Sequence, residues 1–147
     1  MFGEELCLDA NIFIAALSSS EEHHKICHDV LKKVQEEQVL LYEPGLVLYE
    51  VVSALHKKTM KGEMTSEEVE VLIDHLFKLP LLFQWKSNLI KETQQVATKL
   101  DSTKVYDSSY LALARVRDIP LITLDEGLRK KGRKIFRKIL LPTELFH

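Results

Sequence analysis

Leu6-Cys7-Leu8-Asp9-Ala10-Asn11-Ile12-Phe13-Ile14 is the stretch of sequence that decides the fold. It opens with three apolar residues, as expected of a strand that helices cover on both faces. Asp9 follows at the carboxyl end of that strand, which is where open α/β sheets carry their sites. An acid and an amide at a strand end are also common in turns, where their side chains bond the local backbone. Asp9 therefore indicates a site only if the rest of the chain supplies companions.

The length and composition are those of one globular domain. At 147 residues the chain can bury a single core, and we expect residues 1–147 to form one domain. Hydrophobic residues make up 46% of the chain and charged residues 29%. Cys7 and Cys27 lie in apolar patterns, which favours buried free thiols over a disulfide framework. Because we find neither a signal-peptide pattern nor an apolar run of about 20 residues, we expect a cytoplasmic protein.

Apolar strand patterns alternate with helical patterns along the whole chain. No two-residue hairpin joins the strands, so crossover connections and a parallel sheet are expected. The sequence therefore predicts an α/β fold, a three-layer α/β/α sandwich with about five parallel strands. The strands are expected at about 6–8, 39–42, 81–84, 119–124 and 139–141, and the main helices at about 21–37, 45–60, 65–77, 87–100 and 106–117.

Three local signals refine these helices. Ser19 and Glu22 have the spacing of a capping box at the start of the helix near residue 21. Pro44 suits the entry to the helix at 45–60. In the helix at 87–100, Ile90 falls on the stripe expected to face the core.

Three further acids occupy notable positions. Glu50 lies on or at the edge of the core-facing side of its helix, although it could also reach water from a boundary position. Asp107 opens a helix, where the helix dipole by itself favours an acid. Asp125 follows an apolar strand and could serve only as the N-cap of the next helix.

Considered together, the four acids predict a metal site. The carboxyl ends of parallel strands share one edge of the sheet with the amino ends of helices, so Asp9, Glu50, Asp107 and Asp125 should converge there. Carboxylates gathered in a partly dry cleft repel one another unless a cation binds them. An oxygen-only set of ligands favours Mg²⁺ or Mn²⁺ over Zn²⁺.

Four stretches of the sequence carry a resemblance to a known family. They are LDANIFI (8–14), EPGLVLYEVVSAL (43–55), KVYDSSYLALA (104–114) and LITLDEGL (121–128). In this order and approximate spacing the sequence resembles the PIN domain, the nuclease fold of VapBC-type toxins and of several RNA-processing factors. The family's acidic set maps onto the four acids named above, and its small polar companions map onto Asn11 and Thr123.

The resemblance implies a metal-dependent endoribonuclease, possibly the toxin of a toxin–antitoxin pair. Asp9, Asp107 and Asp125 are the expected metal ligands, and Glu50 is expected to bind the metal or to orient the attacking water. Asn11 and Thr123 are expected to hold the carboxylates in place. The partners implied are an RNA substrate, an antitoxin protein and a second copy of the chain in a homodimer.

The distribution of charge adds a candidate surface for nucleic acid. The net charge is −2, yet residues 1–99 carry a formal charge of −6 and residues 100–147 a charge of +4. Seven of the ten residues from 129 to 138 are basic. Such a cluster suits phosphate contacts, although a solvated basic face is the alternative. The residues expected to contact RNA are Arg129, Lys130, Lys131, Arg133 and Lys134.

Two other functions remain open at this stage. One is a phosphatase of another α/β class with Asp9 as nucleophile, but that chemistry needs a second acid where this chain has Asn11. The other is a non-catalytic RNA-binding or assembly module that keeps the same fold. The presence of all four acids argues against the second alternative.

Overall fold

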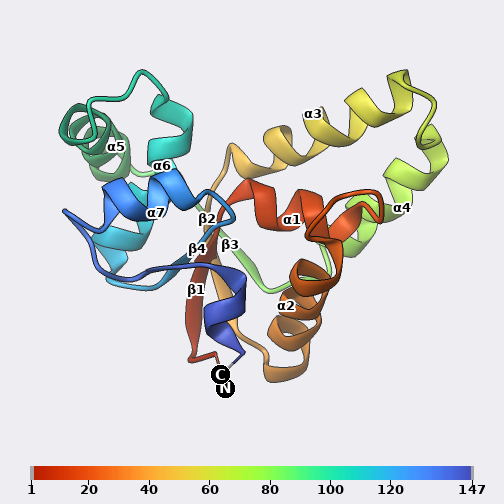
Figure 1. Cartoon of the computed structure of the whole chain (residues 1–147), viewed down its shortest axis with the longest axis horizontal. Helices are drawn as coiled ribbons and strands as arrows, with labels where there is room; N and C mark the ends of the chain where they lie inside the picture. The colour runs from red at the N-terminus through yellow and green to blue at the C-terminus, as the bar shows by residue number, and fades with distance from the viewer. Residues whose placement is uncertain (1, 147) are drawn as a thin grey trace.

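A parallel sheet forms the centre of the molecule (Figure 1). The computed structural model describes residues 2–146, and within them five strands lie in the order β3-β2-β1-β4-β5. The chain builds outward from β1 to β3 and then crosses back to start β4 on the other side of β1. The junction of β1 and β4 is thus the topological switch point, where open α/β sheets bind their ligands. The strands are β1 (Glu5–Leu8), β2 (Leu40–Pro44), β3 (Leu81–Gln84), β4 (Leu121–Ile122) and β5 (Ile139–Leu140).

Helices cover both faces of this sheet, which confirms the predicted three-layer sandwich. In Figure 1, α1 to α4 lie to the right of the strands and α5 to α7 lie to the left. The helices are α1 (Ala10–Leu17), α2 (His24–Glu37), α3 (Val47–Met60), α4 (Ser66–Leu76), α5 (Ser87–Lys99), α6 (Val105–Arg117) and α7 (Glu126–Gly132), followed by the short 3₁₀ helix η1 (Pro142–Leu145). None of the helices within residues 2–146 is long and apolar enough to cross a membrane.

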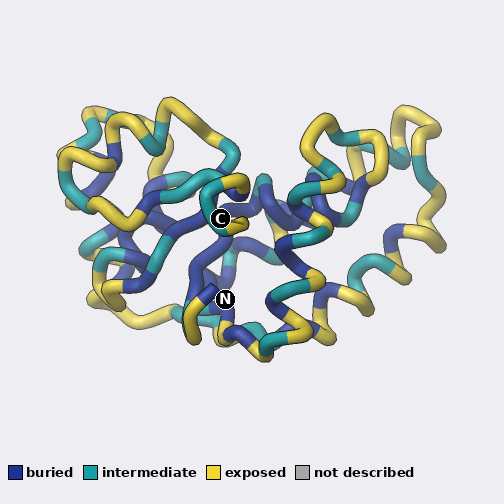
Figure 2. Tube along the Cα trace, turned by 60° about the horizontal axis from the view of Figure 1, so that its bottom comes forward, coloured by how far each residue is buried: buried dark blue, intermediate teal, exposed yellow. Residues whose placement is uncertain are grey.

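The hydrophobic core lies along β1 and the helices that pack on it, as the buried segments in Figure 2 show. Leu6, Cys7 and Leu8 are fully buried, as the opening apolar run predicts. Cys7 and Cys27 are both free and buried, in agreement with the sequence prediction. Near the two ends of the chain the rings of Phe2 and Phe146 pack edge to face, with 5.2 Å between their centroids.

The second strand is longer than predicted. β2 runs through Glu43 and Pro44, which pair with Phe83 and Gln84 of β3. Pro44 therefore ends a strand instead of opening α3, and α3 begins only at Val47. The sequence predicts a strand that stops at about residue 42, but pairing with β3 extends β2 by two residues, through Pro44.

Two other local predictions are wrong. The Ser19–Glu22 capping box does not form, because α2 starts at His24 and both residues precede its N-cap. In α5, Ile90 is exposed and Leu89 is buried instead. The inner face of α5 is the one that packs against α6, and its periodicity alone did not determine which residues that face contains.

Candidate active site

Asp9 connects the carboxyl ends of two neighbouring strands. It follows β1 directly and is only 8% exposed. It occupies the N-cap position of α1, but its side chain makes no capping bond to that helix. Instead the hydroxyl of Thr123, which follows β4, donates a 2.9 Å hydrogen bond to Asp9 Oδ2. The side chain of Asp9 thus links the ends of β1 and β4 across the switch point and does not cap α1.

Thr123 and Asn11 form a network that fixes Asp9. The amide of Asn11 donates to Asp9 Oδ2 at 3.4 Å and to Thr123 Oγ1 at 3.3 Å. Thr123 Oγ1 also accepts the backbone N–H of Asp125 at 3.0 Å, so the hydroxyl uses one donor and two acceptor positions. Asn11 Oδ1 accepts the backbone N–H of Leu124 at 3.2 Å. These bonds hold the segment after β4 against the start of α1.

Glu50 faces the site from α3, where Tyr110 holds it. Tyr110 is fully buried on α6, and its hydroxyl donates to Glu50 Oε1. Burial raises the pKa of Glu50, the bond from Tyr110 lowers it, and the charge of Asp107 raises it. The sequence analysis missed Tyr110. Its position three residues after Asp107 on the same helix was the available signal, because such residues share a face.

Asp107 and Asp125 line a common depression. It has a volume of about 250 Å³ and lies between the start of α6 and α7, with Ser108, Lys104 and Lys131 also in its wall. Asp107 lies in the first turn of α6. Asp125 is the N-cap of α7, and its Oδ1 accepts the backbone N–H of Leu128 at 3.0 Å. The capping alternative for Asp125 is therefore realised, and the same side chain lies on the wall of the depression.

Three of the four acids interact electrostatically. Burial raises the pKa of Asp9 to about 7; the bond from Thr123 opposes this shift, and the charges of Asp107 and Glu50 add to it. Across residues 2–146, no group of three or more His, Cys, Asp or Glu side chains is arranged to hold a metal ion. Asp125 accepts a hydrogen bond from the backbone of α7, and Glu50 accepts one from Tyr110. The four acids therefore converge on one region without forming a closed metal-binding cage.

Glu43 is a buried acid that the sequence analysis did not single out as a site residue. It lies one residue before the end of β2, beside β1, and is fully buried, and its Oε2 accepts the backbone N–H of Leu8 at 2.7 Å. Within the described chain, Oε1 of Glu43 has no hydrogen-bond partner. Burial raises the pKa of Glu43 well above its ordinary value; the Leu8 bond lowers it and the charge of Asp9 raises it further. Its position at a strand end, like that of Asp9, was the missed signal.

The predicted basic surface divides into two parts. Arg129 and Arg133 are engaged with their own chain, at 2.7 and 3.4 Å from the carboxylate of Glu144 in η1. Arg133 also donates to the carbonyl of Ile139. Lys130, Lys131 and Lys134 are exposed, and the ion pairs found within residues 2–146 do not include them. Lys131 is the member of this group that lines the depression of Asp107 and Asp125.

Residues 6–134 match the sequence profile of the PIN domain, and this segment contains all four acids. The chain belongs to the PIN domain family. It is also 30% identical over 129 residues to Ribonuclease VapC3 of Pyrobaculum aerophilum, a match that covers 86% of this chain and 94% of that protein.

Two solved structures share the fold. The crystal structure of PAE2754 from Pyrobaculum aerophilum aligns with a TM-score of 0.69 at 22% identity, over 97% of this chain and 88% of that chain. The VapBC2 structure from Rickettsia felis, bound to a DNA fragment from their promoter, aligns with a TM-score of 0.66 at 14% identity, over 93% and 96%. These alignments confirm the PIN-like arrangement that the resemblance implied.

Proposed function

We propose that this PIN domain is a metal-dependent endoribonuclease that hydrolyses phosphodiester bonds in RNA. The observation that carries the proposal is the environment of the buried Asp9. Thr123 donates a hydrogen bond to it across the switch point, and the charges of Asp107 and Glu50 are close enough to raise its pKa. Acids brought together at a ligand-binding edge, at an electrostatic cost, mark a functional site. The similarity to Ribonuclease VapC3 supports RNA as the substrate.

The donor atoms in this region fit a hard divalent cation. Asp9, Glu50, Asp107 and Asp125 offer only carboxylate oxygens, which suit Mg²⁺ or Mn²⁺. Mg²⁺ keeps several waters and commonly uses one or two carboxylates together with substrate phosphates, so a closed protein cage is not required. Asp9, Asp107 and Asp125 would hold the ion, with Glu50 at its edge. When bound, the ion stabilises negative charge on the scissile phosphate and makes a water easier to deprotonate.

The chain's own residues supply the remaining functions. Glu50 is suited to accept a proton from the attacking water, since burial raises its pKa above the ordinary value and makes the carboxylate a stronger base. Tyr110 fixes the carboxylate that would do so. Thr123 and Asn11 orient Asp9 Oδ2. Lys104 and Lys131 lie beside Asp107 and Asp125 and would bind phosphate oxygens of the substrate.

Cleavage of single-stranded RNA tests the proposed function. We expect the purified protein to cut RNA with Mg²⁺ or Mn²⁺, EDTA to stop cleavage, and Asp107→Asn to reduce the rate by about a thousandfold, since lost ion-mediated charge stabilisation amounts to several kcal/mol. Asp118→Asn is the matched control, because Asp118 is the C-cap of the same helix, at the end away from the site, and has the left-handed backbone that Asn tolerates. Cleavage that survives both EDTA and Asp107→Asn would overturn the proposal.

Metal binding should depend on pH through Asp9. A carboxyl must lose its proton to ligate a metal, and burial with neighbouring charges raises the pKa of Asp9 to about 7. We therefore expect Mn²⁺ to bind more tightly as the pH rises from about 6, by up to about tenfold per pH unit, with a plateau above the Asp9 pKa. Calorimetric titration with Mn²⁺ at several pH values measures this. An affinity that does not change over this range would contradict a role for Asp9 as ligand.

We also propose that the protein works with an antitoxin, as the toxin of a toxin–antitoxin pair. The structural similarity to the VapBC2 complex and the relationship to Ribonuclease VapC3 support this partner. A homodimer remains a further expectation of the resemblance. The phosphatase alternative gains no support, because the Asn11 amide is engaged with Asp9 and Thr123 at the position where a second acid would be needed.

A further inference from the structure

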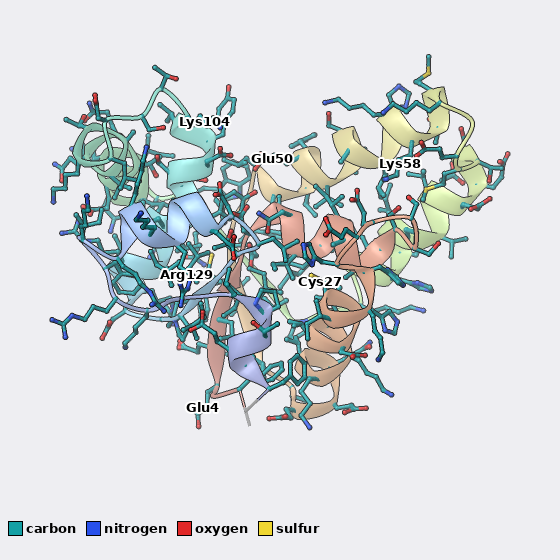
Figure 3. The ribbon with its side chains drawn as sticks, viewed as in Figure 1. Glu4, Cys27, Glu50, Lys58, Lys104 and Arg129 are labelled. Atoms are coloured by element: carbon teal, nitrogen blue, oxygen red, sulfur yellow. The ribbon has the colours of Figure 1, made fainter. Side chains whose placement is uncertain are left out.

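A groove of about 720 Å³ runs from Glu50 along α3. Its floor is formed by α1, its long wall by α3, and α6 contributes one side chain, Tyr106. Figure 3 shows Glu50 at the start of α3, across from the α6 side of the molecule, and Lys58 further along α3. The residues relevant to its chemistry are Tyr49, Glu50, Lys57, Lys58, Lys61 and Tyr106. We call this feature the tyrosine groove.

Two exposed aromatic rings line the end of the tyrosine groove nearest the acids. Tyr49 is 78% exposed and Tyr106 is 72% exposed, although large rings normally lose most of their surface on folding. Each immediately precedes an acid of the site, Tyr49 before Glu50 on α3 and Tyr106 before Asp107 on α6. The two helices thus present one acid and one free ring each to the same region.

Further along the groove, one lysine is paired with acids and two lysines are available to bind a ligand. Lys58 lies 3.1 Å from Glu21 and 3.9 Å from Glu63, which are the acids that line this part of the groove. Lys57 and Lys61 are exposed and take part in none of the ion pairs found in residues 2–146. The far end of the groove therefore presents positive charge, whereas the near end presents rings and carboxylates.

We propose that the tyrosine groove is the binding track for a single RNA strand, with bases stacked on Tyr49 and Tyr106 and phosphates held by Lys57 and Lys61. This rests on the proposed ribonuclease function and adds the path of the substrate and the residues that hold it. Exposed rings beside free lysines are the usual recognition elements for unpaired nucleic acid, because every base has a face that can stack. A duplex keeps its bases stacked internally and cannot use the rings.

The position of the groove favours a nucleic-acid strand over a peptide. An acidic peptide would satisfy Lys57 and Lys61 but offers no series of flat bases to stack on Tyr49 and Tyr106. An RNA strand in the same track presents its phosphates first to the lysines and then to the region where a divalent ion would bind. The groove and the site then form one continuous surface for a single substrate.

Binding without cleavage tests the proposal. We would measure fluorescence anisotropy of a labelled 12-nucleotide oligouridine and of a matched RNA duplex with the full chain in EDTA. We expect Tyr49→Ala with Tyr106→Ala to weaken single-strand binding by about tenfold or more for each ring. The Tyr49→Phe with Tyr106→Phe variant keeps the rings and should bind within about twofold of the parent chain. Phe77→Ala removes an exposed ring outside the groove and is the control.

Salt dependence tests the lysines separately. For single strands the slope of log affinity against log salt falls by about 0.7 for each phosphate that the protein no longer neutralises, so Lys57→Gln with Lys61→Gln should reduce it by about 1.4. Lys91→Gln with Lys99→Gln, on exposed positions of α5, should leave the slope unchanged. Cross-linking of 4-thiouridine RNA to the unmodified chain should mark Tyr49 or Tyr106, and this measurement requires no variant to fold.

The outcomes separate this proposal from the proposed function. Equal losses in the alanine, phenylalanine and Phe77 variants, duplex binding as tight as single-strand binding, or cross-links confined to residues outside the groove would overturn it. If the alanine variants cleave RNA with unchanged KM, the groove is not the track while the ribonuclease stands. If the strand binds as described but is not cut with Mg²⁺ or Mn²⁺, the ribonuclease fails and the track stands.

Discussion

Replacing Asp9 by Asn is expected to reduce RNA cleavage strongly and to stabilise the metal-free protein near pH 8. The amide cannot supply a negatively charged ligand, so we expect a loss of about a thousandfold, corresponding to several kcal/mol of charge stabilisation. The gain in stability has a separate cause. Burial, together with the charges of Asp107 and Glu50, raises the pKa of Asp9 from 3.8 to about 7.

The pH range of this stabilisation follows from the direction of the shift. The folded chain binds the Asp9 proton more tightly than the unfolded chain, so stability falls as the pH rises from the unfolded pKa to the folded pKa. The slope is at most about 1.4 kcal/mol per pH unit for one group. The asparagine side chain of the variant has no proton to lose in this range. The advantage of the variant should therefore be small near pH 4 and should grow until about pH 7.

Urea unfolding in EDTA at several pH values, combined with RNA cleavage assays, measures both effects. Asp74→Asn, at an exposed position of α4, is the control and should change neither quantity. A variant that loses activity and stability together would show that Asp9 is a structural residue. Opposite changes would show that the chain maintains a charge cluster at the expense of stability, as functional sites commonly do.

Replacing Glu43 by Gln should remove a second part of the pH dependence. Burial raises the pKa of Glu43 well above its ordinary value of 4.5, so this side chain also costs stability as the pH rises above 4.5. The glutamine side chain can still accept the Leu8 N–H but cannot ionise. We expect the free energy of unfolding of the variant to fall less steeply with pH, by up to about 1.4 kcal/mol per pH unit.

A second substitution separates the charge of Glu43 from its hydrogen bond. Glu43→Leu also removes ionisation, but it leaves the backbone N–H of Leu8 without its acceptor. An unsatisfied buried donor costs about 1–3 kcal/mol, so the leucine variant should be less stable than the glutamine variant at every pH. Urea unfolding at pH 5 to 8 with unchanged m values tests both substitutions. If the slope of the glutamine variant matches that of the parent chain, Glu43 does not titrate with folding.

The alternation of apolar strands and helices was sufficient to predict the fold class. Parallel strands covered on both faces must be apolar throughout, and the run at Leu6 to Leu8 has this property. The local predictions that failed depended on contacts distant in sequence. β3 extends β2 through Glu43 and Pro44, and packing on α6 buries Leu89 in place of Ile90.

For the proposed site, strand ends and residue types predicted which acids lie toward the carboxyl edge of the sheet. Asp9 and Thr123 follow adjacent strands and are hydrogen-bonded to each other, and the Asn11 amide also donates to Thr123. The hydrogen-bond partner of Glu50 was not evident from the sequence. Tyr110 lies 60 positions away, and only the tertiary fold brings its helix next to Glu50. The same is true of Glu43, whose contact with Leu8 spans 35 positions.

By itself, then, the sequence determined the parallel α/β fold and the acids at its carboxyl edge, because hydrophobic periodicity and strand-end chemistry are local properties. Tertiary structure alone decided how those acids interact. It buried Asp9 and Glu43 on neighbouring strands and placed Asp125 where its side chain caps α7. It also brought Tyr49 and Tyr106 from separate helices to one groove. Burial and charge proximity depend on which distant segments meet, and these set the pKa of Asp9 and the shape of the surface beside it.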